Sequence, residues 1–216
     1  MDIELILIVL GVILVSMTLH EAMHGFIAYW LGDDTAKHQG RLTLNPIKHI
    51  DPFLTIILPL LLALSGGPIF GGAKPVPFNP TRLRYGEWGV ALVAIAGPLT
   101  NLVLAFLSFG IAVLFGDAIT ASHSSLGALG TVLLLSVQVN IGFFAFNMLP
   151  LPPLDGSRVL YALAPEFVRR GMEEIERFGI FVVFLIIVFA NSFIFQYMTW
   201  MMRFFIELFS ALFGVV

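Results

Sequence analysis

The chain has no cysteine among its 216 residues. This absence excludes disulfide bonds, a thiolate nucleophile, a zinc site built on cysteine and an iron–sulfur cluster. Any metal ion in this protein must therefore be held by His, Asp or Glu side chains.

Charged residues are also scarce: they make up 12% of the chain, the net charge is −3 and there is no long basic run. We therefore expect no nucleic-acid partner. Apolar residues make up 58% of the chain, which is more than a soluble domain of this size can bury. The composition predicts a polytopic integral membrane protein whose outer faces contact the lipid bilayer.

The apolar residues fall into about four to six hydrophobic segments, judged by the length that a bilayer requires. The stretch 53–65 contains Pro59 and is too short for a straight span, so we expect a re-entrant half-span there. The Gly- and Pro-rich run 66–80 is expected to be extended, or to hold a short β segment, at the inner face. The predicted fold is an all-α membrane helical bundle that forms one domain, residues 1–216. The predicted full spans are 3–31, 90–115, 126–149 and 179–197, and the tail 199–216 is either a last short span or an interfacial helix.

Lys and Arg residues predict the orientation of the chain, because positive charge is retained on the cytoplasmic side. The N-terminus and the loop 116–125 carry none, whereas 32–87 contains six and 150–178 contains four. We therefore expect the N-terminus outside and the segments 32–87 and 150–178 inside. A half-span at 53–65 that enters and leaves on the inner side agrees with this topology.

The sequence His20-Glu21-Ala22-Met23-His24 is an H-E-x-x-H pattern within the first predicted helix. Residues four apart share a helix face, so both imidazoles can reach one ion, and Glu21 lies beside them. The alternative is a pair of buried histidines with a glutamate that merely pairs with them. We favour a metal site because each ionisable residue at this depth costs about 2.5–3.5 kcal/mol, which a divalent cation would offset.

Two imidazoles leave a catalytic zinc site one protein ligand short. Asp155 is the best candidate, because it directly follows the span 126–149 and a Pro-rich turn, with Gly156 permitting a tight backbone. Capping of a helix over 157–163 is the alternative role for Asp155. The other candidates on the predicted inner side are His38, His49, Asp51 and Glu87, and the loop histidines His38, His49 and His123 are otherwise expected to be solvated.

With both halves in view, the sequence resembles the site-2 protease family of intramembrane zinc metalloproteases, in a compact form without PDZ or CBS modules. The signatures of that family are H-E-x-x-H, here at 20–24, and N-x-x-P followed by L-D-G, here at 147–150 and 154–156. The segment 71–80 and Gly97-Pro98-Leu99-Thr100-Asn101 also resemble stretches of bacterial and archaeal members.

The resemblance implies one Zn²⁺ per chain, held by His20, His24 and Asp155, with Glu21 as the general base. It implies an endopeptidase that hydrolyses peptide bonds in or near the transmembrane helices of substrate proteins. The expected location is the cell membrane of a bacterium or archaeon, with the active site near the cytoplasmic side. Without PDZ or CBS modules, the regulation that these modules give other members would be absent or would come from a separate membrane protein.

Substrate contacts are expected from two places. An unwound substrate helix needs new partners for its backbone, and Gly72, Pro75, Val76 and Pro77 could present an extended edge to it. Asn147 could bind the substrate backbone or the oxyanion, and an interhelical hydrogen bond is an equal alternative.

Gly97, Pro98 and Asn101 are interpreted as a packing and polar contact between helices rather than as catalytic groups. A rival function is a metal-handling membrane protein or transporter that uses the same His and Asp residues, which would need ligands but no general base at Glu21. A second rival, an inactive scaffold of the protease fold, is disfavoured by the intact motif.

Overall fold

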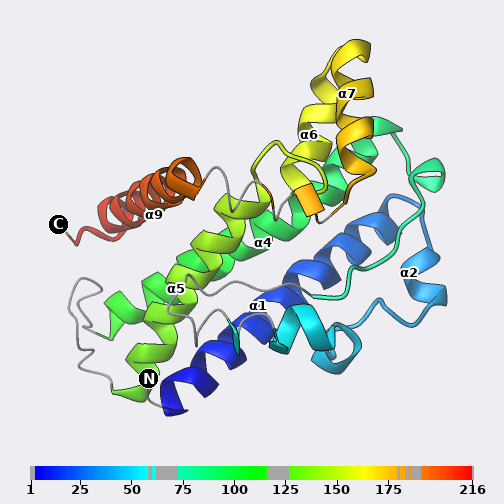
Figure 1. Ribbon diagram of the computed structural model, residues 1–216. Coiled ribbons are helices and arrows are strands. Elements are labelled where there is room, and N and C mark those ends of the chain that lie inside the picture. The colour runs from blue at the N-terminus through cyan, green and yellow to red at the C-terminus, as the bar shows by residue number, and fades with distance from the viewer. Residues whose placement is uncertain are drawn as a thin grey trace.

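The computed structural model describes residues 3–57, 60–61, 73–115, 127–179, 181–182, 185 and 191–215, and within these ranges every regular element is a helix. Three long helices form the centre: α1 (Ile3–Trp30), α4 (Glu87–Leu114) and α5 (Ala128–Asn147) (Figure 1). Helices α6 (Asp155–Leu163) and α7 (Glu166–Glu176) project from one end of this bundle. The remaining elements are α2 (Thr35–His38), the 3-10 turns Pro46–Lys48 and Pro80–Arg82, a π-helix at Pro52–Ile57, and α9 (Asn191–Phe213). The predicted all-α class is confirmed.

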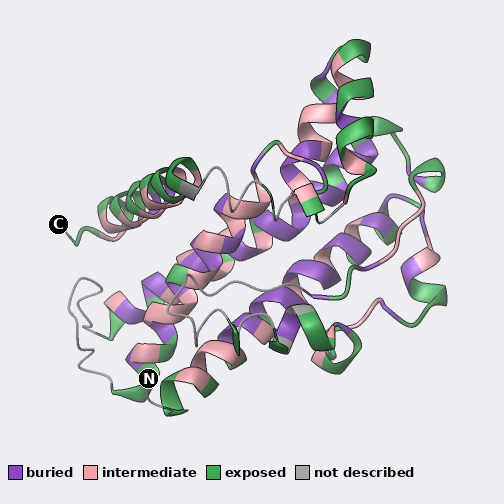
Figure 2. Cartoon of the chain, viewed as in Figure 1, coloured by how far each residue is buried: buried purple, intermediate pink, exposed green. Residues whose placement is uncertain are grey.

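Helices α1, α4 and α5 are each long and apolar enough to cross a bilayer. They begin and end within three residues of the predicted segments 3–31, 90–115 and 126–149. Large apolar side chains are exposed on their outer faces, among them Val15, Leu92 and Val103, as expected for surfaces that meet lipid. Figure 2 shows that the buried residues concentrate where the three helices face one another.

Helix α4 is the central element, because it packs against α1, α5 and α6 and also meets α9. Its buried face carries small residues, including Gly89, Ala94, Gly97 and Ala105. Small side chains allow helix backbones to approach closely in a membrane. This close approach brings side chains from α1, α4 and α5 within hydrogen-bonding distance of one another.

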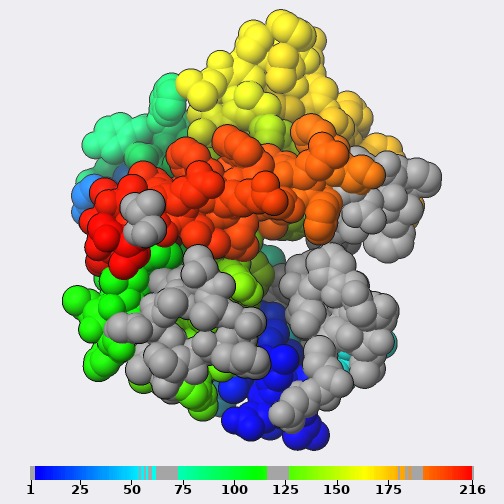
Figure 3. Space-filling model, turned by 90° about the vertical axis from the view of Figure 1, so that its left-hand side faces the viewer, coloured from blue at the N-terminus to red at the C-terminus, as the bar shows by residue number. Residues whose placement is uncertain are grey.

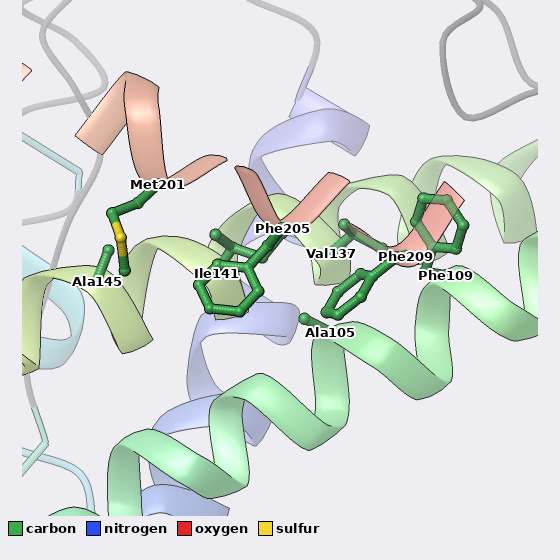
Figure 4. Packing of buried hydrophobic residues seen from close by; sticks show 8 residues of the cluster. All are labelled: Ala105, Phe109, Val137, Ile141, Ala145, Met201, Phe205 and Phe209. Atoms are coloured by element: carbon green, nitrogen blue, oxygen red, sulfur yellow. The ribbon is translucent and has the colours of Figure 1, made fainter. Parts of the chain in front are cut away.

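Helix α9 lies across one face of the molecule, where it packs against α5 and meets α4 (Figure 3). It runs along α5 in the opposite direction, and its contact residues recur every fourth position. Figure 4 shows Met201 opposite Ala145, Phe205 opposite Ile141, and Phe209 near Val137, Ala105 and Phe109. The hydroxyl of Tyr197 donates to the carbonyl of Ala145 at 3.1 Å and so fixes the start of the same contact.

The continuity of α9 corrects one prediction. The sequence predicts a span that ends at Tyr197 and a separate tail that begins at Thr199, but the helix continues through both residues. The range 191–213 contains no Pro or Gly that would end a helix. Arg203 and Glu207 suggested an interruption, but both lie on the exposed face of α9. Residues 180, 183–184 and 186–190 of the predicted span 179–197 lie outside the described residues.

The predicted half-span 53–65 is described only at 53–57 and 60–61, where 53–57 belongs to the π-helix, so its course is not tested. Within the Gly- and Pro-rich run, residues 73–79 form no helix and no β segment. The backbone of Asn79 is extended, with φ −108° and ψ 108°. Gly72 lies outside the described residues.

The loop histidines differ in their surroundings. His38 is exposed and its Nε2 lies 2.8 Å from Asp34 Oδ2. The prediction that His49 is solvated is wrong, because its side chain is buried and its Nε2 bonds the Thr43 carbonyl at 2.8 Å. The N–H of Lys74 donates to the carbonyl of His49 at 2.9 Å, so the segment 73–79 covers this loop. His123 lies outside the described residues.

Candidate active site

His20 and His24 lie one turn apart on α1, and both are buried against α4. Their Nε2 atoms are 3.0 Å apart and the rings meet edge-on at 87°. The Nδ1 of His24 lies 2.7 Å from the carbonyl oxygen of Val93. A carbonyl only accepts, so the proton of the neutral His24 ring is on Nδ1 and Nε2 carries a lone pair. The lone pair on Nε2 of His24 is therefore available to bind a cation beside His20.

Asp155 brings a carboxylate to the same point from α6. Its Oδ2 lies 3.2 Å from His20 Nε2 and 3.5 Å from His24 Nε2. Zinc–ligand bonds of about 2.0–2.1 Å in a tetrahedron place the ligand atoms about 3.3 Å apart. The donor set therefore fits a zinc ion in both chemistry and spacing.

The capping role considered for Asp155 does not occur. Asp155 is the first residue of α6, Leu154 is the capping residue, and no side-chain capping bond is made there. The carboxyl group of Asp155 instead lies against the two imidazoles, and an ionised carboxylate is the form that binds a metal ion.

Two glycines make room for this arrangement. A Cβ atom on Gly97 would lie 2.5 Å from His24 Nε2 and 2.7 Å from His20 Cε1, so the bare backbone of α4 forms the wall behind both imidazoles. A Cβ atom on Gly156 would lie 2.4 Å from the carbonyl oxygen of Met148. Gly156 therefore permits a tight backbone, as expected, because there is no room for a side chain at this position.

Glu21 brings a second carboxylate to the histidine pair. It is buried, and its ligand atom and those of His20 and His24 all lie within 4.8 Å of one another. Its Oε2 accepts a hydrogen bond from the N–H of Val76 at 2.8 Å. The two carboxylates come from different elements, Glu21 from α1 and Asp155 from the first turn of α6.

The segment 73–79 is held beside Glu21 by buried charged residues that no motif in the sequence marks. Arg41 Nη2 donates to the carbonyls of Lys74 and Pro75 at 2.7 and 3.3 Å. Asp33 Oδ2 accepts from the N–H of Asn79 at 2.6 Å. Loop charges of this kind look like solvated residues in a sequence, and only the folded chain shows them to be buried.

The predicted substrate residues are only partly brought to the site. Val76 contacts Glu21 through its backbone, while Pro75 is exposed and Pro77 is half-buried. Asn147 Nδ2 donates to the carbonyl of Phe143, one turn earlier in α5, at 3.0 Å. Within the part of the chain that the structure describes, no hydrogen bond joins Asn147 to the histidines or to either carboxylate.

Asn101 is a site residue that the sequence reading missed, since it was interpreted as a helix-packing contact. It is fully buried, and its Oδ1 lies 2.6 Å from Nδ1 of His20. The available signal was its spacing: Asn101 follows Gly97 by one turn, on the same face of α4. Of the other candidates for the third ligand, Asp51 accepts from the N–H of Phe53 and Glu87 is exposed at the start of α4.

Comparison with known proteins agrees with this geometry. A family profile described as "Peptidase family M50" matches residues 118–190. The chain is 46% identical to "Putative zinc metalloprotease YwhC" of Bacillus subtilis over 178 residues, which cover 81% of this chain and 77% of that protein. It is 36% identical to "Putative zinc metalloprotease Rip2" of Mycolicibacterium smegmatis, over 88% of this chain and 71% of that protein. No solved structure matches the chain.

Two histidines of a long apolar helix and an aspartate that approaches them define a candidate metal site in a membrane protein. The chain belongs to peptidase family M50, the site-2 protease family, and is a metalloendopeptidase. The predicted family, enzyme class and membrane setting are thereby confirmed.

Proposed function

We propose that this protein is an intramembrane endopeptidase that hydrolyses peptide bonds in or near the transmembrane helices of substrate proteins. Zinc is the cofactor, in agreement with the names of its relatives. One observation carries the proposal: His20 Nε2, His24 Nε2 and Asp155 Oδ2 converge at 3.0–3.5 Å inside the helical bundle.

His20, His24 and Asp155 would hold the ion, and Glu21 would act as the general base. When bound, zinc polarises a carbonyl and makes water a stronger nucleophile. Glu21 takes a proton from the attacking water and returns it to the nitrogen of the leaving amine. Because the N–H of Val76 engages Oε2, the other carboxylate oxygen of Glu21 is the one positioned to carry the proton.

The site lies inside the membrane region in this proposal. His20 is ten residues before Trp30, the last residue of α1, which corresponds to about 15 Å of helix. With the N-terminus outside, the site lies in the cytoplasmic half of the bilayer. The charged helices α6 and α7 then lie on the cytoplasmic side, from which water can reach the ion.

The segment 73–79 would bind the unwound substrate through its carbonyl groups. Pro75 and Pro77 have no N–H to offer, and the N–H of Val76 is engaged by Glu21. The carbonyls of Lys74 and Pro75 accept from Arg41. The carbonyls of Val76 and Pro77 are therefore the groups best placed to accept from the N–H groups that an unwound helix exposes.

A transporter that uses the same ligands is the rival function. It has no need of a carboxylate beside the ion that is fixed by a backbone N–H. The buried Glu21, held by Val76, therefore favours hydrolysis.

The deciding experiment compares the parent with Glu21→Gln and Asp155→Ala, using a tagged single-span substrate in proteoliposomes and elemental analysis for zinc. Loss of the general base should lower the rate by about 10²–10⁴-fold while zinc stays stoichiometric. Asp155→Ala should lose stoichiometric zinc. Glu87→Gln, an exposed acidic residue of α4, is the matched control. Parent-like cleavage by Glu21→Gln would rule out the mechanism, and unchanged zinc in Asp155→Ala would assign the third ligand to Glu21.

A further inference from the structure

A chain of side-chain hydrogen bonds leads from His20 across all three long helices. Asn101 Oδ1, on α4, lies 2.6 Å from His20 Nδ1, and Asn101 Nδ2 donates to Asn140 Oδ1, on α5, at 2.8 Å. Asn140 Nδ2 donates to Ser16 Oγ at 2.9 Å and to the carbonyl of Ser136 at 2.8 Å. Both amides have no exposed surface. Two fully buried amides in an apolar bundle are costly unless their hydrogen bonds are satisfied.

The far end of this chain fixes the direction of every bond in it. The carbonyl of Ser136 only accepts, so the amide nitrogen of Asn140 faces it and the amide oxygen of Asn140 faces Asn101. That oxygen also only accepts, so Asn101 presents its nitrogen there and turns its oxygen toward His20. The oxygen of Asn101 requires an N–H on Nδ1 of His20, which leaves the lone pair on Nε2, directed at Asp155.

The two histidines are thus oriented by different means. His24 is fixed in one step by the backbone carbonyl of Val93. His20 is fixed by an amide, and an amide can rotate by half a turn to present either a donor or an acceptor. Asn101 is held in one of these orientations by Asn140 alone among the described residues, apart from a long contact of 3.5 Å to the carbonyl of Ser16.

We propose that Asn140 is a positioning residue that acts through Asn101 to set the orientation and tautomer of His20 for zinc binding. This inference rests on the metal-ligand role of His20 in the proposed function. Without Asn140, Asn101 can turn its nitrogen toward His20, which favours the ring with its proton on Nε2. In that tautomer the lone pair is on Nδ1, which faces Asn101, and Nε2 has none to offer the ion.

Zinc affinity of the full chain in detergent, measured by competition with a chelator, tests the inference independently of activity. Partners that hold a metal-binding histidine typically contribute about 10–100-fold in affinity. The loss of zinc affinity in Asn101→Leu should fall in that range. Asn140→Leu, one step further from His20, should weaken zinc binding about 10-fold. The double variant should match Asn101→Leu, because Asn140 acts through Asn101. Losses that multiply in the double variant would mean that each residue acts by itself and would overturn the inference.

A rescue variant distinguishes positioning from general support of the fold. Asn101→Asp has an acceptor in either orientation, so it should restore zinc affinity in the Asn140→Leu background. Asn140→Ala, which adds no bulk, should give the same result as Asn140→Leu and replaces it if the larger side chain prevents folding.

Two control variants should leave zinc affinity unchanged. Thr100→Val, at the residue before Asn101, removes a hydroxyl that donates to the carbonyl of Ala96. Thr131→Val removes a hydroxyl that donates to the carbonyl of Gly127 at the start of α5, nine residues before Asn140. If the parent itself holds no stoichiometric zinc, the proposed function fails. If the parent holds zinc and the Asn140 variants bind it equally well, only the inference fails.

Discussion

Helix α5 has two buried faces that are held in different ways. One face turns Asn140 and Ser136 toward α1 and α4, where they take part in the hydrogen-bond chain that ends at His20. The other face turns Val137, Ile141 and Ala145 toward α9, where phenylalanines fill the contact (Figure 4). We refer to these contacts as the polar layer and the aromatic layer.

The difference between the two layers shows where the orientation of the side chains must be fixed. In lipid, apolar side chains gain little by leaving the acyl chains, so the aromatic layer depends on close packing, which several arrangements of side chains can provide. Hydrogen bonds in the polar layer have fixed donors and acceptors, so each member determines its neighbour. His20, one of the three proposed metal ligands, lies at the end of the polar layer, which permits only one arrangement of its donors and acceptors.

The largest expected difference between the layers comes from the same substitution at two positions of α4. An added Cβ atom would meet His24 Nε2 at 2.5 Å in Gly97→Ala and Phe213 Cζ at 2.5 Å in Gly110→Ala. The imidazoles are held on several sides, whereas Phe213 lies at the last turn of α9 and can move. Gly97→Ala should therefore weaken zinc binding by more than about 100-fold, beyond the range for residues that only hold a metal-binding histidine. Gly110→Ala should bind zinc like the parent. Equal zinc affinities in a chelator titration would show that the layers do not differ.

Removal of an aromatic side chain should affect stability and leave the ion site intact. Phe209 is buried between α5 and α4, and Phe→Ala changes in packed cores cost about 3–5 kcal/mol. Phe209→Ala should therefore lower the midpoint of thermal unfolding in detergent, while the folded fraction keeps the zinc affinity of the parent. Phe204→Ala, on the exposed face of α9, is the control. A loss of zinc affinity in folded Phe209→Ala would mean that the aromatic layer also orients the ligands.

A smaller effect is expected where the polar contacts extend beyond the helices to Glu21. Val76→Pro removes the N–H that binds Glu21 Oε2, and Val76→Ala keeps it. A lost hydrogen bond to a charged group is worth about 1.5–3 kcal/mol. Val76→Pro should therefore lower kcat by roughly 10–100-fold with zinc content unchanged. If both variants lose the same activity in the substrate assay, the side chain of Val76 matters and its N–H does not.

The smallest expected effect is a gain in stability in the aromatic layer. A Cβ atom on Gly142 of α5 would meet only Met198 Cε, at the ordinary distance of 3.9 Å. Replacing Gly by Ala within a helix stabilises it by about 0.5–1 kcal/mol. Gly142→Ala should raise the thermal midpoint slightly and leave zinc affinity unchanged. A lower midpoint would show that this layer is packed too tightly to accept one methyl group.

The sequence predicted the three long helices and the convergence of His20, His24 and Asp155. These predictions succeeded because their signals are strong: long apolar runs, a four-residue spacing on one helix face, and an aspartate directly after a span. The roles of these residues remain proposals. Substrate contacts at Gly72, Pro75, Val76, Pro77 and Asn147 also remain predictions.

Other features could not be read from the sequence, for identifiable physical reasons. An asparagine in an apolar helix does not reveal which neighbour it bonds, so Asn101 was interpreted as packing and Asn140 was not singled out. Burial of His49 and Arg41 depends on a segment that crosses the loop from more than twenty residues further along the chain. The continuity of α9 was missed because its two charged residues lie on the face away from α5.

Of the two imidazoles, only that of His20 is oriented from α5. Binding of the metal ion and packing of α5 against its neighbours should therefore strengthen each other. If ordering of His20 by α5 strengthens the hold on the ion, then the ion must strengthen the hold on α5 by the same free energy. Removal of the metal with a chelator should therefore loosen α5 against its neighbours, with faster amide hydrogen exchange in α5 than in the part of α1 around His24. The cofactor would then be a structural brace of the bundle as well as the source of its chemistry.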